Sequence, residues 1–473
     1  MGITRRDLIS ALAAPLAPLP HSARRPNIIF VLTDDQGYGD LACHGNPIVK
    51  TPNLDRLHDQ SVRFLDYHAS PTCAPTRASI MTGRHEFKSG VTHTIYERER
   101  MSLKATTIAQ VLHSAGYATG IFGKWHLGDA APYQPGKRGF DEVFIHGCGG
   151  IGQDYGGTCA DAPGNTYFSP YILHNGVFEK TDGYCTDVFF RQALNWIDGR
   201  RKSGAPFFAY ITTNAPHVPL QCPEQYIDLY RGKTPDENTA RYFGMVTNID
   251  DNVGRLMAKL TEWGIERDTI LIFMTDNGGT GGVRVFNAGM RGAKATPWEG
   301  GTRVPLFVRW TGAWSPAEVK ELAGAIDLFP TLAAIAHAEI PAGLELDGRN
   351  VLPLIERRNV SWPDRYLFTH VGRWDKGKAA QSKYARCRVR NARFSMVSLG
   401  PEKNWQLFDL KNDFGEKENV IHRFDKEARA MDAAYDKWWA EILPCLENEN
   451  AQPPAVSPYK ELFWKQFGSG KPA

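Results

Sequence analysis

The chain alternates short apolar, β-branched runs with helical stretches, and this alternation restricts its fold more than any other feature. Buried strands are predicted over residues 27–32, 117–122, 207–211, 269–274 and 303–310. Helices are predicted over residues 53–64, 107–114, 186–197, 238–263 and 327–338. Strands that are apolar throughout and separated by helices are typical of a parallel sheet covered on both faces. We therefore expect an α/β fold with a large, mixed, mostly parallel sheet flanked by helices.

Polar residues follow four of these predicted strands at once. They are Asp34 and Asp35, Lys124 and His126, His217, and Asp276 with Asn277. Taken singly, each has an ordinary reading as a solvated turn or a surface side chain. Because the carboxyl ends of parallel strands share one edge of a sheet, we expect these residues to meet there. Chance explains the whole set poorly.

The acidic members of this set indicate a metal site. Asp34, Asp35, Asp276 and Asn277 offer only hard oxygen ligands. Such ligands suit Ca²⁺ or Mg²⁺ better than zinc or copper. The sequence therefore predicts a divalent hard cation at the sheet edge.

A cysteine precedes one predicted helix in the stretch Pro-Thr-Cys-Ala-Pro-Thr-Arg-Ala-Ser-Ile-Met-Thr-Gly, residues 71–83. Pro75 is placed in the first turn, so Cys73 faces the positive end of the helix dipole, and Arg77 lies one turn on. That setting stabilises an anion at Cys73 and predicts a reactive thiol. A buried structural cysteine is the alternative reading.

This stretch resembles the signature of the formylglycine-dependent sulfatases, of arylsulfatase type, in the alkaline phosphatase superfamily. The resemblance rests on Cys-x-Pro-Thr-Arg with Met-Thr-Gly behind it, on Gly-Lys-Trp-His-Leu-Gly at 123–128, and on Trp-Glu-Gly-Gly at 298–301. These blocks occur in the family's order along most of the chain. Thr76 stands where the family usually has serine, and it keeps the hydroxyl group.

The resemblance implies an alkaline phosphatase-like fold and a modified nucleophile. A formylglycine-generating enzyme would oxidise Cys73 to formylglycine, whose hydrated aldehyde attacks sulfur. One Ca²⁺, rather than Mg²⁺, would bind there. The metal ligands it implies are Asp34, Asp35, Cys73, Asp276 and Asn277.

The resemblance also assigns the remaining catalytic roles. Arg77 would hold the hydrated aldehyde, while Lys124 and Lys294 would bind sulfate oxygens as point charges. His217 would contact the substrate and protonate the leaving alcohol, helped by Lys294. His126 would then remove the proton of the second geminal hydroxyl, so that sulfate is expelled and the aldehyde reforms.

Composition excludes several classes of protein. The chain has 55 basic and 52 acidic residues, and its net charge of +3 includes no basic run typical of a nucleic-acid-binding surface. Eight cysteines in 473 residues do not form a disulfide scaffold, and at least one should be unpaired if Cys73 is modified. No apolar run is long enough to span a bilayer.

The chain is predicted to have three parts. Arg5-Arg6, followed by an apolar segment, predicts a twin-arginine export signal over residues 1–24 and a periplasmic or secreted protein; a chance Arg-Arg pair is the alternative. The catalytic domain would cover 25–345. From about residue 365, short strands (366–368, 386–389, 394–397, 405–410) and a helix (427–443) predict an antiparallel subdomain over 346–473.

The preferred function is hydrolysis of sulfate esters on a sulfated glycan or an aryl compound. A phosphoesterase or phosphonate hydrolase of the same superfamily is the alternative, and a catalytically silent binding module is a third hypothesis. We expect loops near 85–93, 147–171 and 279–291 to form the pocket walls, within a long loop region over 136–181. The candidates for sugar contacts are His146, Asp154, Arg284 and Arg291.

Overall fold

The computed structural model describes residues 25–468. The predicted export signal at 1–24 therefore lies outside the described residues. Among the residues described, no helix combines the length and the apolarity needed to cross a bilayer.

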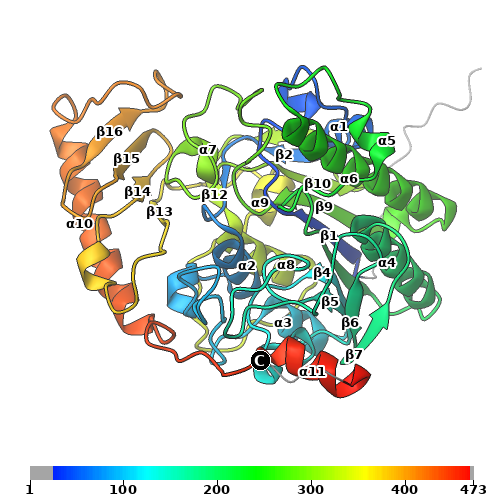
Figure 1. Cartoon of the computed structure of the whole chain (residues 1–473). Helices are drawn as coiled ribbons and strands as arrows, with labels where there is room; N and C mark the ends of the chain where they lie inside the picture. The colour runs from blue at the N-terminus through cyan, green and yellow to red at the C-terminus, as the bar shows by residue number, and fades with distance from the viewer. Residues whose placement is uncertain (1–24, 469–473) are drawn as a thin grey trace, which may run out of the picture.

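A ten-stranded sheet forms the centre of the molecule (Figure 1). In spatial order it contains β11 (Ala317–Val319), β2 (Val62–Phe64), β10 (Leu306–Trp310), β9 (Thr269–Thr275), β1 (Asn27–Thr33), β8 (Phe207–Thr212), β4 (Ala118–Lys124), β5 (Glu142–His146), β6 (Tyr171–His174) and β7 (Val177–Lys180). The five central strands, from β9 to β5, run parallel, whereas β10, β6 and β7 pair in antiparallel fashion with their inner neighbours. The mixed, mostly parallel sheet is confirmed.

Helices cover both faces of this sheet. One core contains α2 (Cys73–Thr82), α3 (Ile108–Ser114) and α8 (Leu328–Ile335); the other contains α1 (Pro52–Asp59), α4 (Cys185–Arg201), α5 (Glu224–Ile227) and α6 (Glu237–Glu262). Along β1, Phe30 packs in the first core and Val31 in the second. Because both faces are buried, the strand has to be apolar at every position.

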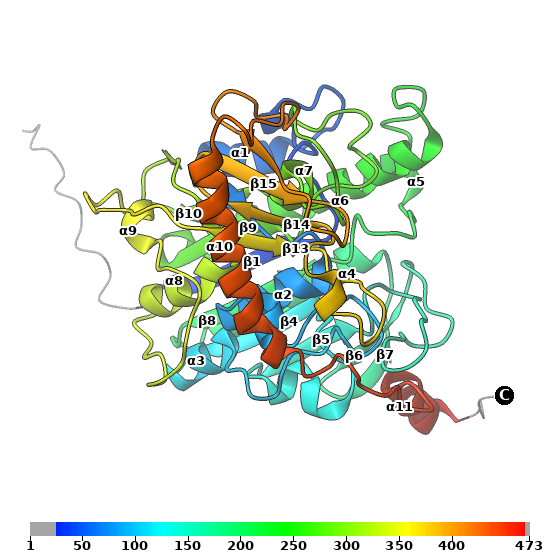
Figure 2. The same cartoon turned by 90° about the vertical axis from the view of Figure 1, so that its left-hand side faces the viewer.

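A four-stranded antiparallel sheet follows in the C-terminal part of the chain (Figure 2). It consists of β13 (Leu367–His370), β14 (Cys387–Arg390), β15 (Phe394–Ser398) and β16 (Gln406–Asp409), and α10 (Asp425–Ile442) packs on it. The last helix, α11 (Pro458–Phe467), returns to the large sheet, where the Gln466 side chain exchanges two hydrogen bonds with the backbone of Phe178 in β7.

Buried charges join a short helix of the large domain to the C-terminal sheet. Glu299 opens the short helix α7 (Glu299–Thr302), and its carboxylate accepts hydrogen bonds from Arg388 at 2.8 Å and Arg390 at 2.9 Å, both in β14. All three side chains are buried. The remaining short β-strands and α-helix are β3 (Tyr67–His68), β12 (Ala323–Gly324) and α9 (Leu352–Ile355).

Two predicted segments differ from the structure. The helix predicted over 53–64 ends at Asp59, and its last residues form β2, because Val62 and Phe64 are buried by pairing with β10. The loop predicted over 136–181 contains β5, β6 and β7. A two-residue turn, Asn175-Gly176, joins β6 to β7 with positive φ at both residues, and Asn-Gly is a strong hairpin signal.

Candidate active site

The predicted strand-end residues meet at one edge of the large sheet. Asp34 and Asp35 follow β1, and Asp276 follows β9 directly alongside. The backbone N–H of Asp276 donates to the carbonyl oxygen of Thr33 at 3.0 Å, and that of Asp35 donates to Asp276 Oδ1 at 3.2 Å. Parallel pairing of adjacent strands therefore brings the carboxylates together, as predicted.

Three buried carboxylates and one amide fit a hard cation. Asp34, Asp35 and Asp276 each offer an oxygen, and these oxygens lie within 4.8 Å of one another. Burial, together with the charge of Asp276, raises the pKa of Asp34 to about 8. The Oδ1 atoms of Asp34 and Asn277 accept no hydrogen bond from any described residue. Crowded carboxylate charge and bare oxygen acceptors are what a divalent cation would neutralise.

Cys73 lies beside this acidic group. It is the first residue of α2, its side chain is 2% exposed, and its sulfur lies 3.5 Å from Lys294 Nζ. Burial and the charge of Asp34 raise the pKa of the Cys73 thiol to about 12. The prediction of a thiolate stabilised by the helix dipole is therefore wrong, because desolvation and neighbouring carboxylate charge outweigh the dipole.

Two buried cations lock the acidic group in place. Arg77 donates to Asp276 Oδ2 and to the carbonyl oxygen of Lys124, both at 2.9 Å. Lys124 Nζ lies 2.5 Å from Asp34 Oδ2, and neither member of that pair reaches solvent. Arg77 and Lys124 thus contact the carboxylates and the backbone from the protein interior, and neither lines the cavity at Cys73.

Lys294 is the cation that faces the opening of the site. Its Nζ lies 2.5 Å from Asp35 Oδ1, and its side chain is 14% exposed. The nearby charge of Asp35 raises the pKa of Lys294, although burial opposes this, so the ammonium stays protonated.

Both predicted histidines are neutral. Burial and the charge of Lys124 hold the pKa of His126 well below its usual range, and its Nε2 lies 2.8 Å from the carbonyl oxygen of Thr94. Burial lowers the pKa of His217 to about 3. His217 Nδ1 donates to the carbonyl oxygen of Val218, so its Nε2 carries the lone pair and lies 3.8 Å from Asp35 Oδ2.

A cavity of about 190 Å³ opens over these groups. Its lining consists of Cys73, His126, His217 and Lys294 from the predicted set, and of His93, Thr94, Ile95, Gly149, Gln153, Tyr155 and Arg373. Two of the three predicted wall loops contribute to this lining, whereas the loop over 279–291 contributes nothing. Arg373 comes from the loop that follows β13 of the C-terminal sheet, and no local motif marks it in the sequence.

The four residues considered for sugar contacts lie elsewhere. His146 is buried beside the carbonyl oxygen of Gly147, and Asp154 pairs with Lys460. Arg284 pairs with Asp236 at 3.0 Å, and Arg291 stacks 3.7 Å from the Trp298 ring centroid. None of the four lines the cavity at Cys73.

A disulfide braces one wall of the cavity. Cys148 and Cys159 are bonded and flank Gly149, Gln153 and Tyr155. The other six cysteines, including Cys73, are free. This confirms that at least one cysteine is unpaired.

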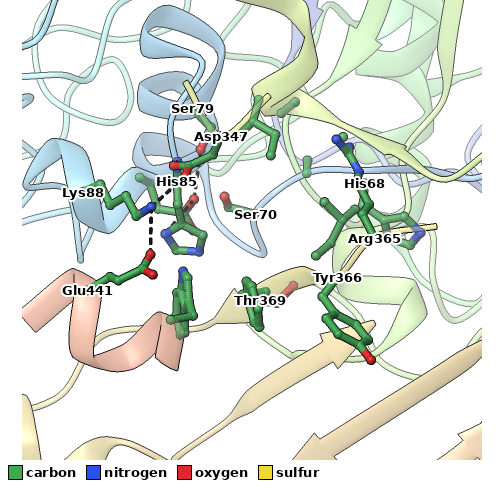
Figure 3. A pocket seen from close by; sticks show the side chains of 18 of the residues that line it. His68, Ser70, Ser79, His85, Lys88, Asp347, Arg365, Tyr366, Thr369 and Glu441 are labelled. Atoms are coloured by element: carbon green, nitrogen blue, oxygen red, sulfur yellow. Dashed lines mark hydrogen bonds and ion pairs between the residues drawn. The ribbon is translucent and has the colours of Figure 1, made fainter. Parts of the chain in front are cut away.

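A second cavity, of about 320 Å³, lies between the large domain and the C-terminal sheet (Figure 3). Most of its charged side chains already have partners; Lys437 is exposed at its edge. Lys88 lies 2.7 Å from Asp347 and 3.4 Å from Glu441, and Arg365 pairs with Asp327. It contains none of the strand-end residues, so we assign it to domain packing.

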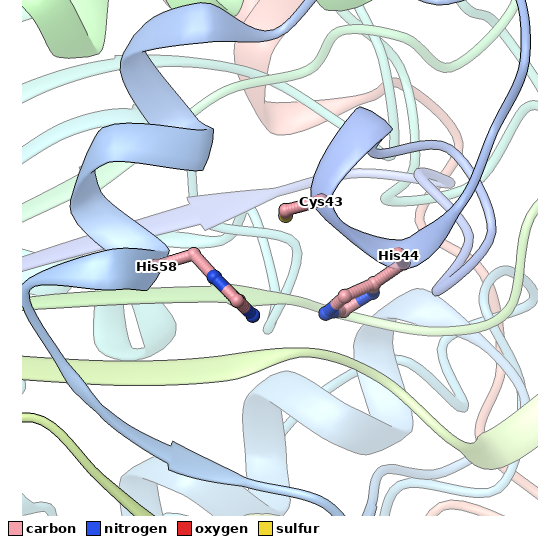
Figure 4. Close-up of side chains that lie close together, drawn as sticks. All are labelled: Cys43, His44 and His58. Atoms are coloured by element: carbon pink, nitrogen blue, oxygen red, sulfur yellow. The ribbon is translucent and has the colours of Figure 1, made fainter.

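Cys43, His44 and His58 form a further group of possible metal ligands (Figure 4). The guanidinium of Arg63 lies 3.4 Å from both ring nitrogens of His58, so a cation here would meet a fixed positive charge. His44 stacks on Tyr38 with ring centroids 3.9 Å apart. We assign this group to aromatic packing.

Comparisons with known proteins agree with this geometry. The family model described as Sulfatase matches residues 26–338, and the one described as N-sulphoglucosamine sulphohydrolase, C-terminal, matches residues 293–437. Arylsulfatase G of Homo sapiens is 31% identical over 497 residues, covering 92% of this chain and 91% of that protein. Arylsulfatase J of Mus musculus is 33% identical over 332 residues, covering 69% of this chain but only 55% of that protein. The structure of Ps i-CgsB in complex with k-i-k-neocarrahexaose has a TM-score of 0.79 at 28% identity, covering 93% of this chain and 97% of that chain.

Proposed function

The chain belongs to the sulfatase family and is a sulfuric ester hydrolase, and we propose that it releases sulfate from a sulfated carbohydrate. In this proposal residue 73 is a formylglycine, and one Ca²⁺ is held by Asp34, Asp35, Asp276 and Asn277. The observation that carries the proposal is the position of Cys73, with Lys294 on one side of it and the buried carboxylates on the other.

The acidic group supports the metal assignment through its chemistry. It offers oxygen ligands only, and two of those oxygens accept no hydrogen bond from the described residues. When bound, the cation would supply a Lewis acid that offsets negative charge on the sulfate group. Arg77 and Lys124 hold Asp276 and Asp34 in place for it.

Lys294 and His217 are the residues proposed to bind the sulfate group and to protonate the departing alcohol. Of the cations that line the cavity, Lys294 is the one beside position 73, so it binds a sulfate oxygen there. Its ammonium is also the protonated group beside position 73, whereas His217 is neutral with a lone pair on Nε2. The departing alcohol therefore takes its proton from Lys294 directly, or through His217 once that ring has accepted one.

The surroundings of the cavity favour a carbohydrate over a small aryl sulfate. The cavity at Cys73 shares His93, Tyr155 and Arg373 with an outer cavity of about 520 Å³. Tyr96 and Tyr155 line the outer cavity and are 61% and 50% exposed, and exposed aromatic rings are platforms for sugar rings. A relative of known structure, Ps i-CgsB, binds k-i-k-neocarrahexaose.

Phosphate ester hydrolysis within the same superfamily is the alternative reaction. It is disfavoured by the ligand set, because at this sheet edge the described residues offer one oxygen-rich group rather than a histidine-rich or two-metal site. Turnover of 4-nitrophenyl sulfate and 4-nitrophenyl phosphate by the same preparation separates the two reactions. A large preference for phosphate would contradict sulfate ester hydrolysis.

The decisive experiment is a mass spectrum of the peptide that contains residue 73, from protein produced together with a formylglycine-generating enzyme. We expect a mass about 18 Da below that of the cysteine peptide, the change from thiol to aldehyde. The Cys73→Ala variant serves as the inactive control. An unmodified thiol in a fully active preparation would refute the formylglycine assignment, and an unmodified thiol in an inactive one would support the silent binding module.

We also propose that residues 1–24 direct export through the twin-arginine pathway to the periplasm or the medium. In this reading residues 25–345 form the catalytic domain and residues 346–473 the C-terminal subdomain. A reporter fused to residues 1–26 should be exported with Arg5 and Arg6 intact. Export that survives their joint replacement by lysine would remove the proposal.

A further inference from the structure

We propose that the substrate carries a second anionic group, a sulfate or a carboxylate, close to the sulfate that is removed, and that Arg373 binds it. This inference rests on the proposed function. It identifies the substrate class as a glycan with at least two anionic groups, and it makes the C-terminal sheet part of the binding site.

Arg373 is held at the cavity by its backbone. It follows β13, and the preceding Gly372 packs so closely that a Cβ there would lie 2.0 Å from the carbonyl oxygen of Thr92. The backbone N–H of Arg373 donates to that same carbonyl oxygen at 3.3 Å, and its Nη2 donates to Thr94 Oγ1 at 3.1 Å. The guanidinium therefore has a defined position at the wall of the cavity.

The positive charge of Arg373 has no acidic partner among residues 25–468. The buried Arg388 and Arg390 in the same sheet are paired with Glu299, but Arg373 forms no ion pair. Its Nε is buried and donates to no described residue. Within the described residues, the Arg373 side chain donates its one hydrogen bond to the neutral Thr94 hydroxyl, so its charge is not neutralised and can attract an anion in the cavity that Arg373 lines.

A second unpaired guanidinium strengthens the positive field here. Arg386 forms no ion pair with a described residue and donates only weakly, to the carbonyl oxygen of Gly372 at 3.4 Å. Burial and the charge of Arg373 lower the pKa of Arg386. Arg386 lines neither cavity, but its charge adds to the positive potential around Arg373 and so favours an anion beside Arg373.

Arg373 lies at the junction of the inner and outer cavities. Three of the residues in the described range 25–468 line both cavities: His93, Tyr155 and Arg373. His93 Nδ1 accepts hydrogen bonds from the backbone N–H groups of Thr94 and Ile95, so the neutral ring carries its proton on Nε2 as a further donor. A sugar that places its sulfate at Cys73 extends through this junction.

Carboxylates in the outer cavity do not compete for Arg373. Glu449 lies 3.8 Å from Arg98 and accepts from Trp374, and Glu97 accepts from the backbone of Thr158 at 2.9 Å. Asp375 is exposed and forms no ion pair with a described residue. Lys376 also lines the outer cavity, but it is exposed and donates to the carbonyl oxygen of Ala451, so Arg373 is the cation at the junction of the two cavities that forms no ion pair with a described residue.

The test compares inhibition of 4-nitrophenyl sulfate hydrolysis by three disaccharides: one with a single sulfate, one with two sulfates, and one with a sulfate and a uronic acid. Against the unmutated protein, one or both doubly charged sugars should inhibit about 10- to 100-fold more tightly than the singly charged one, as expected for a charge-assisted hydrogen bond. The stronger of the two identifies the anion as sulfate or carboxylate.

Arg373→Gln should abolish this preference, and Arg373→Lys should retain part of it. Lys378→Gln is the matched control, because Lys378 is exposed on the same loop and lines neither cavity. The proposal is overturned if all three sugars inhibit alike, or if Lys378→Gln changes the preference as much as Arg373→Gln. Failure of the proposed function gives a different result: protein that contains formylglycine would not hydrolyse 4-nitrophenyl sulfate. In that case calorimetric titration of the protein and of Arg373→Gln with the same three sugars measures whether Arg373 binds the second anion.

Discussion

Arg77 and Asp276 form a buried ion pair, with Arg77 Nη2 2.9 Å from Asp276 Oδ2 and both side chains withdrawn from solvent. The other oxygen of Asp276 accepts the backbone N–H of Asp35. The Asp276 carboxylate is therefore part of the acidic group, and it also neutralises the charge of Arg77 on α2, the helix that begins at Cys73. Any change at Asp276 should affect both metal binding and stability.

Asp276→Ala should abolish Ca²⁺ binding and sulfatase activity, and it should also lower the free energy of unfolding by about 3–5 kcal/mol, because Arg77 stays buried without its partner. Calorimetric titration with Ca²⁺ and urea unfolding measure the two effects. Asn277→Ala is the comparison, since its Oδ1 has no partner among the described residues. Asn277→Ala should weaken Ca²⁺ binding, and it should lower the free energy of unfolding less than Asp276→Ala does. Full activity in Asp276→Ala would disprove the metal assignment.

Lys294→Ala should reduce kcat by about 10²–10³-fold, because it removes the cation that faces both the sulfate group and position 73. Steady-state kinetics with 4-nitrophenyl sulfate provide the measurement. A mass spectrum of the residue-73 peptide has to show the same modification as in the unmutated protein, which separates lost catalysis from lost maturation. Unchanged kcat with a raised KM would reduce Lys294 to a binding residue.

Replacing Cys148 and Cys159 together by serine should lower the free energy of unfolding by about 2–3 kcal/mol, since the disulfide closes a short loop. The loop carries Gly149, Gln153 and Tyr155 of the cavity wall, so KM for a sulfated oligosaccharide should rise more than KM for 4-nitrophenyl sulfate. Serine at Cys43 and Cys445, which are free, is the control. Equal effects on both substrates would contradict a role in the wall.

The cost of replacing His44 should depend on pH. Burial lowers the pKa of His44 to about 3, below its value of about 6.5 in the unfolded chain. The unfolded chain therefore binds the proton first, and the stability that His44 contributes is present above pH 6.5 and is lost as the pH falls toward 3. His44→Gln should destabilise the protein at pH 8, and this loss should shrink by up to about 1.4 kcal/mol per pH unit below 6.5. Urea midpoints at pH 5 and pH 8 test this; a loss of constant size would contradict it.

The strand-end part of the site could be predicted because parallel topology alone brings it together. Asp34, Asp35, Asp276 and Asn277 follow strands that are apolar at every position, and such strands are visible in the sequence. The hydrogen-bonded register of β1 and β9 then sets their proximity. The same logic placed Lys124 and the two histidines.

The remainder depends on long-range packing that no local pattern encodes. Arg373 reaches the cavity because the C-terminal sheet docks through Glu299, and that contact joins residues about ninety positions apart in the sequence. The pKa of Cys73 was misjudged because the helix dipole is visible in the sequence, whereas full burial beside Asp34 is not. Strands β5, β6 and β7 are not predicted because each has only four or five residues in a segment rich in glycine.

The burial of Cys73 also determines when, relative to folding, its side chain can be oxidised. A modifying enzyme has to surround the side chain that it oxidises, and in the folded chain that side chain is 2% exposed. Under the proposed function, oxidation must therefore finish on the nascent chain, before α2 docks against the sheet. Folding and maturation then compete kinetically, and a molecule that folds before oxidation keeps an unmodified, buried thiol. The yield of active enzyme from an expression host therefore depends on the rate of oxidation relative to the rate of folding. Slower translation or a colder culture should raise this yield.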